Sequence, residues 1–263
     1  MGDSTRLAAR LTQMGQPFTI ALPEGAGGGR TPQTRRVTGL ELALADHAPA
    51  CRRPLERAAK RAIDLVAAGA GLVVLAPAML AIAALLRRDG DVFFAQSRIG
   101  EGGRRFRCLK FRSMHPDAES RLRQLLDSDP AARAEWAAHQ KLSRDPRITS
   151  LGRFLRRTSL DELPQLINVL RGEMSLVGPR PMVAPEVPGY DNDHAYYHGP
   201  DCTWYAACRP GISGLWQISG RATTGYAERI RLDRWYARHW SIWLDIAILL
   251  KTLRVVLFSR TAS

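Results

Sequence analysis

The chain has 263 residues, enough to bury one sizeable hydrophobic core together with a tail or a small subdomain. Its formal net charge of +13 and its pI near 10.4 favour an anionic partner: a nucleic acid, an anionic membrane surface or a phosphorylated substrate. The four cysteines form no CxxC pair and no zinc-ligand spacing, and no signal peptide is recognisable at Met1, so we expect a reduced cytoplasmic setting.

Residues 1–50 carry no sustained hydrophobic period and contain several glycines, prolines and scattered charges, so we expect a flexible tail. Within it, the glycine-rich run from Gly25 to Gly29 could be read as a phosphate loop. It lacks the Lys-Ser/Thr pair that follows such a loop and has no clear preceding strand. We therefore assign no ligand to it.

A nearly uninterrupted apolar run extends from Ala62 to Leu86, with Asp64 as its only charge. This is about the length needed to cross a bilayer core of ~30 Å. Basic residues flank both ends, so a straight span would leave one cluster outside, against the positive-inside tendency, and Pro77 interrupts helix hydrogen bonding near the middle. We therefore predict that residues 51–90 form a re-entrant membrane helix that bends at Pro77 and returns to the same face. A buried core helix and a straight span are the alternatives.

The next segment predicts a β-hairpin followed by helices. Residues 92–99 and 104–111 have the pattern of two strands around a glycine-rich turn, which places Lys110 near the end of the second strand. Residues 116–142 have the composition of an exposed helical excursion, and a further helical segment leads into residues 153–157.

Asp161 and Glu162 are adjacent carboxylates at the predicted start of a helix that Gly172 ends. A helix N-terminus favours negative charge and can also hold a phosphate. Arginines lie on both sides, among them Arg156 upstream and Arg180 in the stiff Gly-Pro-Arg-Pro turn downstream. An acidic helix cap is the simpler interpretation of the pair alone, but these surroundings together predict phosphoryl chemistry.

The remaining segments are less informative. Residues 183–208 look irregular, and His194 and His198 have the i, i+4 spacing of metal ligands, although the segment lacks helical periodicity and is crowded with Gly and Pro. Residues 232–258 predict a helix whose tryptophans and cations beside an apolar run are typical of a membrane interface. Packing against the protein core is the alternative, and both can hold.

Ordered motifs occur along the chain. They are Lys60–Asp64, Phe94–Gly100, Lys110–Met114, Asp145–Thr149, Gly152–Pro181, Arg209–Arg221 and Trp240–Asp245. Together they resemble the monotopic phosphoglycosyl transferases, bacterial sugar transferases that move a hexose-1-phosphate onto a polyprenyl phosphate carrier. The Trp216-Gln217 form and the short membrane portion are similar to members that start exopolysaccharide repeat units. One departure is Ala76, where the family often has Ser before the re-entrant proline.

The resemblance implies a mixed α/β, helix-rich fold. It consists of a small cytoplasmic catalytic domain over residues 91–263, an N-terminal re-entrant membrane helix and interfacial amphipathic helices. The protein would be monotopic at the cytoplasmic face of the bacterial inner membrane and in contact with its lipid. It would transfer a hexose-1-phosphate, with galactose or glucose favoured, from a UDP-sugar to undecaprenyl phosphate, and so initiate exopolysaccharide or other surface glycan synthesis.

The resemblance also assigns roles to residues. Asp161 would attack the β-phosphorus of the UDP-sugar, UMP would leave, and undecaprenyl phosphate would then attack the aspartyl sugar-phosphate. Glu162 would orient the nucleophile or help Asp161 to hold Mg²⁺, a hard cation suited to oxygen ligands and substrate phosphates. Lys110 and Arg180 would neutralise phosphate charge, and we expect the cationic surroundings to keep Asp161 ionised.

Three further residues match family positions, and each has two possible roles. Arg156 and Arg147 are candidates for phosphate binding, and Asp245 is a candidate functional carboxylate. A structural salt bridge is the alternative for each of the three.

Two rival functions follow from the same sequence. The stretch from Arg104 to Arg107 mixes cations with an aromatic residue, as nucleic-acid-binding surfaces do, but no helix-turn-helix or zinc-finger motif accompanies it, so we expect no nucleic-acid partner. An inactive scaffold of polysaccharide assembly is the other rival. The intact Asp161-Glu162 pair and Arg180 argue against it.

Overall fold

A computed structural model describes residues 17–20, 35–38, 54–139, 142–219 and 226–258. The chain divides into two units, Met1–Ala48 and Pro49–Ser263. In the first, β1 (Pro17–Ile20) and β2 (Arg35–Thr38) form an antiparallel pair. The flexible tail predicted for residues 1–50 falls mostly outside the described residues, as does the glycine run at 25–29.

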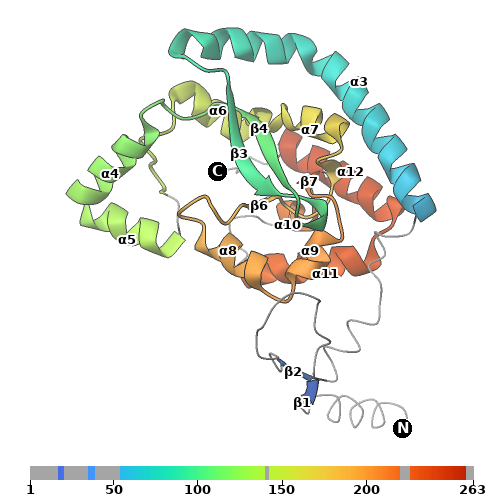
Figure 1. The fold of residues 1–263 in the computed structure, drawn as a ribbon. Coiled ribbons are helices and arrows are strands. Elements are labelled where there is room, and N and C mark those ends of the chain that lie inside the picture. Colours follow the sequence, from blue (N-terminus) through green and yellow to red (C-terminus); the bar gives the residue numbers. More distant parts are fainter. Residues whose placement is uncertain (1–16, 21–34, 39–53, 140–141, 220–225, 259–263) are drawn as a thin grey trace, which may run out of the picture. The chain divides into compact units, whose positions relative to one another are not determined.

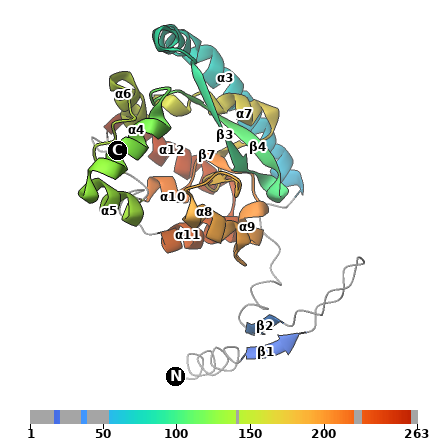
Figure 2. The same ribbon diagram turned by 60° about the vertical axis from the view of Figure 1, so that its left-hand side comes forward.

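The second unit begins with one long helix, α3 (Pro54–Leu86). Proline is well suited to the first helical position because its missing N–H has no partner there, and the Ala- and Leu-rich sequence that follows favours a helix. The helix extends further toward the N-terminus than the apolar run and continues through Pro77. It nevertheless changes direction partway along its length, as both ribbon views show (Figures 1 and 2).

A three-stranded antiparallel sheet follows α3, in the order β4-β3-β6. The predicted hairpin is confirmed: β3 (Phe93–Ile99) pairs with β4 (Arg105–Phe111) around a short 3₁₀ turn, with Phe93 opposite Phe111. The much later β6 (Met182–Val183) pairs with the end of β3. The sheet therefore brings residues near position 182 beside the hairpin.

A parallel pair of strands carries the turn that contains Arg180. β5 (Ser175–Val177) pairs with β7 (Gly211–Ser213), and a Cβ atom added to Gly178, directly after β5, would lie 2.2 Å from the Arg209 carbonyl oxygen. Glycine is therefore required for this close backbone approach. It places the Gly-Pro-Arg-Pro turn directly after β5.

Further α-helices complete the described part of this unit. They are α4 (Ala118–Ser128), α5 (Pro130–His139), α6 (Ser150–Thr158), α7 (Gln165–Arg171), α8 (Asp191–His198), α9 (Cys202–Ala206), α10 (Leu215–Ile218), α11 (Tyr226–His239) and α12 (Ile242–Phe258). The mixed, helix-rich α/β fold is thus confirmed, and the helices expected within residues 116–142 and around 153–157 are present.

Two expectations about these helices are wrong. The segment 183–208, predicted to be irregular, contains α8 and α9, and the two aspartates in the first turn of α8 favour a helix start. The single helix predicted over 232–258 is two helices, α11 and α12. Ser241 explains the break, because its Oγ accepts a hydrogen bond of 3.2 Å from the Leu244 amide as an N-cap and so starts α12.

Both halves of α3 pack against the same folded body. Ala68, in the first half, belongs to a buried cluster with Phe106 and Leu166, whereas Ile82 and Leu86, in the second half, pack with Phe111 and Leu155. Other apolar side chains of α3 face outward, among them Val66 (73% exposed), Val73 (76%) and Leu80 (69%).

By length and composition α3 could cross a membrane: its most apolar window has a mean hydropathy of 2.4 and is only 11% buried by the rest of the protein. A soluble core helix would be mostly buried. This exposure therefore argues against the core-helix alternative.

Candidate active site

The acidic pair lies in a 3₁₀ turn, Leu160–Glu162, rather than in the first turn of an α-helix as predicted. Ser159 precedes it with φ 57° and ψ 17°, and it is the only non-glycine residue with positive φ in the part of the chain that the structure describes. This left-handed conformation ends α6 abruptly and costs on the order of 1–3 kcal/mol, a kind of strain that clusters at functional sites. Gly172, with φ 81°, ends α7 as predicted.

A buried amide aligns this turn with β4. Asn168 of α7 accepts a hydrogen bond of 3.0 Å from the Leu109 amide and donates one of 2.8 Å to the Arg107 carbonyl. Its side chain thus pairs with the edge of β4 as a neighbouring strand would. Lys110, the next residue along β4, is thereby brought to the turn that carries Glu162.

Glu162 lies between two cations from different elements. Its Oε1 is 2.7 Å from Lys110 Nζ and 3.8 Å from Arg180 Nη1, which comes from the turn after β5. The side chains of Lys110 and Arg180 are 22% and 28% exposed, so an incoming phosphate could still contact both. The structure therefore brings together three of the residues that the sequence singled out.

Asp161 is only 7% exposed. Burial raises the pKa of its carboxyl above the ordinary value and Glu162 adds to the rise, although nearby Lys110, Arg156 and Arg180 oppose it. We expected the cations to prevail, but desolvation has the larger effect. The Asp161 carboxylate accepts no hydrogen bond from any residue within the described ranges, which leaves its lone pairs available for nucleophilic attack.

The two other candidate arginines differ in their surroundings. Arg156 donates a hydrogen bond of 2.8 Å from Nε to the buried Ser113 hydroxyl, and its charge acts on Asp161. Arg147 is paired with Asp145, to which its Nε and Nη2 donate hydrogen bonds of 2.9 Å and 2.7 Å, and it lies 4.8 Å from the ring centre of Trp136. These contacts favour a site role for Arg156 and the structural alternative for Arg147.

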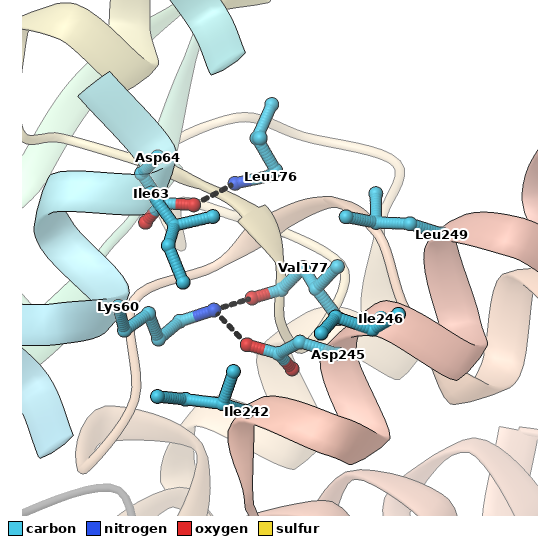
Figure 3. A pocket seen from close by; sticks show the side chains of 9 residues that line it. All are labelled: Lys60, Ile63, Asp64, Leu176, Val177, Ile242, Asp245, Ile246 and Leu249. Atoms are coloured by element: carbon cyan, nitrogen blue, oxygen red, sulfur yellow. Dashed lines mark hydrogen bonds and ion pairs between the residues drawn. The ribbon is translucent and has the colours of Figure 1, made fainter. Parts of the chain in front are cut away.

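Asp245 belongs to a separate network that joins α3 to α12. Its carboxylate accepts hydrogen bonds from the Tyr236 hydroxyl (2.7 Å) and the Trp240 indole (3.0 Å), and it pairs with Lys60. Lys60 also donates a hydrogen bond of 3.0 Å to the Val177 carbonyl at the end of β5, as Figure 3 shows. These contacts favour the structural alternative for Asp245.

The same region contains a small pocket between α3, β5 and α12. Its lining residues are Lys60, Ile63, Asp64, Leu176, Val177, Ile242, Asp245, Ile246 and Leu249 (Figure 3). Asp64 accepts hydrogen bonds from the Leu176 amide (3.0 Å) and the Ser175 hydroxyl (3.1 Å). The first half of α3 is therefore fastened to β5, the strand that precedes the Arg180 turn.

Replacing Lys60 by Met should lower the free energy of unfolding by about 2 kcal/mol, because it leaves the Asp245 carboxylate buried without its ion pair. Denaturant unfolding in detergent would measure this loss. A second change, Asp245→Leu, should restore part of the stability, since it removes the orphaned charge. Arg57→Met is the matched control. Arg57 is also on α3 and forms an ion pair with Glu101, but its side chain is 40% exposed, so the free energy of unfolding should fall by less than about 1 kcal/mol. Equal losses in the two variants would contradict this interpretation.

The residues present could bind Mg²⁺ only together with a phosphorylated substrate. The described residues contain no group of three or more His, Cys, Asp or Glu side chains that could hold a metal ion. Mg²⁺ usually keeps several waters and binds through one or two carboxylates plus substrate phosphates, which Asp161 and Glu162 could provide. These two carboxylates therefore suit a metal ion that enters the site bound to the phosphates of a substrate. The metal-ligand spacing of His194 and His198 gains no support as a zinc site, because His198 is exposed on α8 and no third ligand accompanies His194 in the described part of the chain.

Sequence reasoning missed several residues that shape this region: Lys60 and Asp64 as anchors of α3, Asn168 and Ser113 as partners of site elements, and the buried Asp193 and Arg229. A signal existed for Asn168, a polar residue within the otherwise apolar run of α7, and for Asp64, the only charge in the apolar run of α3. The others pair with residues far away in sequence, which periodicity does not detect.

Comparison with known proteins agrees with the resemblance. A family model described as bacterial sugar transferase matches residues 55–259. The UDP-galactose-lipid carrier transferase of Erwinia amylovora is 49% identical over 199 residues, and the undecaprenyl-phosphate glucose phosphotransferase of Komagataeibacter xylinus is 42% identical over 224 residues. These alignments cover 75% and 80% of the chain but only 40% and 38% of the two relatives. The exopolysaccharide production protein ExoY of Rhizobium meliloti is 44% identical over 210 residues, which are 79% of the chain and 89% of ExoY.

Proposed function

Because the chain belongs to the bacterial sugar transferase family, we propose that it transfers a hexose-1-phosphate from a UDP-sugar to undecaprenyl phosphate and so starts exopolysaccharide or another surface glycan. The observation that carries this proposal is the meeting of Asp161 and Glu162 with Lys110 and Arg180 in one partly exposed cluster. Relatives named for galactose and for glucose make these two sugars the favoured substrates.

In the first step, an Asp161 oxygen attacks the β-phosphorus of the UDP-sugar. A bond from the aspartate to phosphorus forms, the bond from the β-phosphorus to the bridging oxygen breaks, and UMP leaves with that oxygen. The absence of hydrogen bonds to Asp161 from the residues described supports this role, as does the proximity of three cations. Lys110 acts as a point charge and Arg180 as a planar fork for the phosphates.

In the second step, a phosphate oxygen of undecaprenyl phosphate attacks the same phosphorus. The aspartyl–phosphorus bond breaks, the carboxylate is regenerated, and the product is a diphosphate-linked sugar lipid. A covalent intermediate divides one transfer between two bulky anions into two easier steps. Mg²⁺, held by Asp161 or Glu162 together with substrate phosphates, would supply charge screening for the diphosphate.

The packing of α3 supports a monotopic protein at the cytoplasmic face of the inner membrane. Lys60 near its start bonds to β5, and Leu86 at its end packs with Phe111 of β4. A straight span would place these two ends on opposite sides of the bilayer. Both ends contact the same folded unit, which argues against a straight span. On α12, Trp243 is 79% exposed and Leu250 is 63% exposed, as an interfacial helix requires.

Tags placed at Met1 and at Ser263 should both be labelled only from the cytoplasmic side, because a re-entrant α3 returns the chain to the face from which it entered. The measurement compares an impermeant label applied to intact cells with the same label applied after the inner membrane has been opened. Labelling of one tag in intact cells would show a straight span.

The function itself is tested by incubating purified protein with undecaprenyl phosphate and each of several labelled UDP-sugars. We expect UMP and a lipid-linked sugar phosphate with UDP-galactose or UDP-glucose, and not with a nucleoside diphosphate that lacks sugar. No UMP release with any donor would overturn the proposal and favour an inactive scaffold. Salt-sensitive binding to nucleic acid without any transfer would favour the other rival.

A further inference from the structure

The segment from Arg180 to Val183 is held in place by side chains from four different elements. Arg229 of α11 donates a hydrogen bond of 2.9 Å to the Arg180 carbonyl, and Arg98 of β3 donates one of 2.8 Å to the Pro181 carbonyl. The Tyr205 hydroxyl of α9 accepts a bond of 3.1 Å from the Met182 amide, and Asp193 of α8 accepts one of 2.8 Å from the Val183 amide. In Figure 1, β6 lies among these elements.

Arg229 and Asp193, the two side chains that hold the ends of this segment, are also bonded to each other. Arg229 Nη1 lies 2.7 Å from Asp193 Oδ1, so one ion pair connects the Arg180 carbonyl to the Val183 amide. Arg229 and Asp193 are 4% and 7% exposed. A buried ion pair is weak evidence for stability, because the desolvation penalty offsets the attraction, but its geometry can specify one arrangement of the backbone.

Arg229 faces two carboxylates, and the pKa values of the two shift in opposite directions. Although burial opposes it, the Arg229 charge holds the pKa of Asp193 below its usual value. Asp233 lies 3.8 Å from Arg229 Nε, and burial raises the pKa of Asp233 to about 7. Asp193, at the shorter distance, is therefore the main ion-pair partner of Arg229.

The guanidinium of Arg180 reaches the candidate site. It lies 3.8 Å from Glu162, and its carbon is 5.8 Å from the ring centre of Trp216. Arg229 lies against the same indole ring, at 5.5 Å. Arg229 thus contacts the main chain of Arg180 and also Trp216, the indole that lies beside the Arg180 side chain.

We infer that Arg229 is a positioning residue for the donor diphosphate: together with Asp193 it fixes the backbone of Arg180 so that the guanidinium meets the phosphate. This inference rests on the function proposed above. It predicts that Arg229 affects catalysis through Arg180, since a displacement of about 1 Å at a catalytic group can cost on the order of 10²-fold in rate.

A double-mutant cycle tests the coupling. Arg229→Lys should lower the rate of UMP release from the UDP-sugar by about 10²-fold in the wild-type background. In the Arg180→Met background, the same change should have less than about a twofold effect, because the group that it positions is already gone. Arg231→Lys is the matched control: it makes the same change on α11, at a side chain that is 75% exposed, and should leave the rate unchanged.

The outcomes separate this inference from the proposed function. Equal fold losses in the two backgrounds would show that Arg229 acts on the fold generally and would overturn the inference, while wild-type activity would leave the proposed function standing. A wild-type protein that releases no UMP would overturn both. If Arg229→Lys does not fold, Tyr205→Phe decides the question. It removes the hydroxyl that accepts from the Met182 amide and donates to the Ile99 carbonyl of β3, and its rate loss should also vanish in the Arg180→Met background.

Discussion

Replacing Asp161 by Asn is expected to abolish UMP release from a UDP-sugar supplied without acceptor, and with it all formation of lipid-linked sugar. An amide cannot form the acyl phosphate, so the loss should be on the order of 10⁶-fold, as for other enzymes that lose their nucleophile. Donor supplied alone should leave one sugar-phosphate on the wild-type protein, detectable by mass spectrometry on the peptide that contains Asp161. Asp127→Asn, at an exposed site on α4, is the control and should keep full activity.

The Asp161→Asn protein should fold at least as stably as the wild type at neutral pH. Burial raises the pKa of Asp161 in the folded state, so the folded protein binds this proton more tightly than the unfolded chain does. The ionised carboxylate therefore destabilises the fold above both pKa values, and Asn removes that cost. The advantage should shrink as the pH falls toward the ordinary Asp pKa of about 3.9. Product formed without an adduct at Asp161, or a variant that fails to fold, would contradict this account.

The predictable parts of the fold are those with local signals. The hairpin of β3 and β4 follows from two segments with a strand pattern on either side of a glycine-rich turn, and the α3 helix follows from its long apolar run. By contrast, α8 and α9 lie in a polar stretch with little periodicity. Their core-facing residues, Tyr196 and Tyr205, pack edge-on against each other, so tertiary packing and not local sequence makes these helices stable.

The candidate site was predictable where the sequence placed distinctive groups within recognisable motifs. Asp161, Glu162, Lys110 and Arg180 belong to such motifs, and they converge in space; their roles in catalysis remain predictions. For Arg147 and Asp245, the sequence left both a site role and a structural role possible, and only their contacts in the structure favour one of the two. Arg147 is occupied by Asp145, and Asp245 lies in the network of Lys60.

Arg229 and Asp193 could not be predicted to pair, because 36 residues separate them along the chain. A buried arginine also looks the same in the sequence as a solvated one on the polar face of a helix. The pairing of β6 with β3, together with the hydrogen bonds from Asp193 and Arg229, holds the Arg180 segment beside α8 and α11. The partners of this segment therefore follow from topology, not from motif.

Replacing Arg180 by Met should lower the rate of UMP release by about 10²- to 10³-fold, the usual cost of removing one group that stabilises developing negative charge. Glu162 would then retain only Lys110 of the two cations beside it, and the donor phosphates would lose their planar fork. Arg180→Lys should recover only part of the rate, because an ammonium keeps the charge but does not bind two phosphate oxygens in one plane.

Arg157→Met is the matched control for this change. Arg157 is exposed in the last turn of α6, beside Arg156, so its loss alters the basic charge of the region without touching the acidic turn. If diffuse positive charge alone recruited the donor, the two variants would slow UMP release equally and salt would weaken both in the same way. If Arg157→Met keeps the wild-type rate of UMP release while Arg180→Met loses most of it, and Arg180→Lys lies between the two, the geometry of the guanidinium stabilises the leaving UMP.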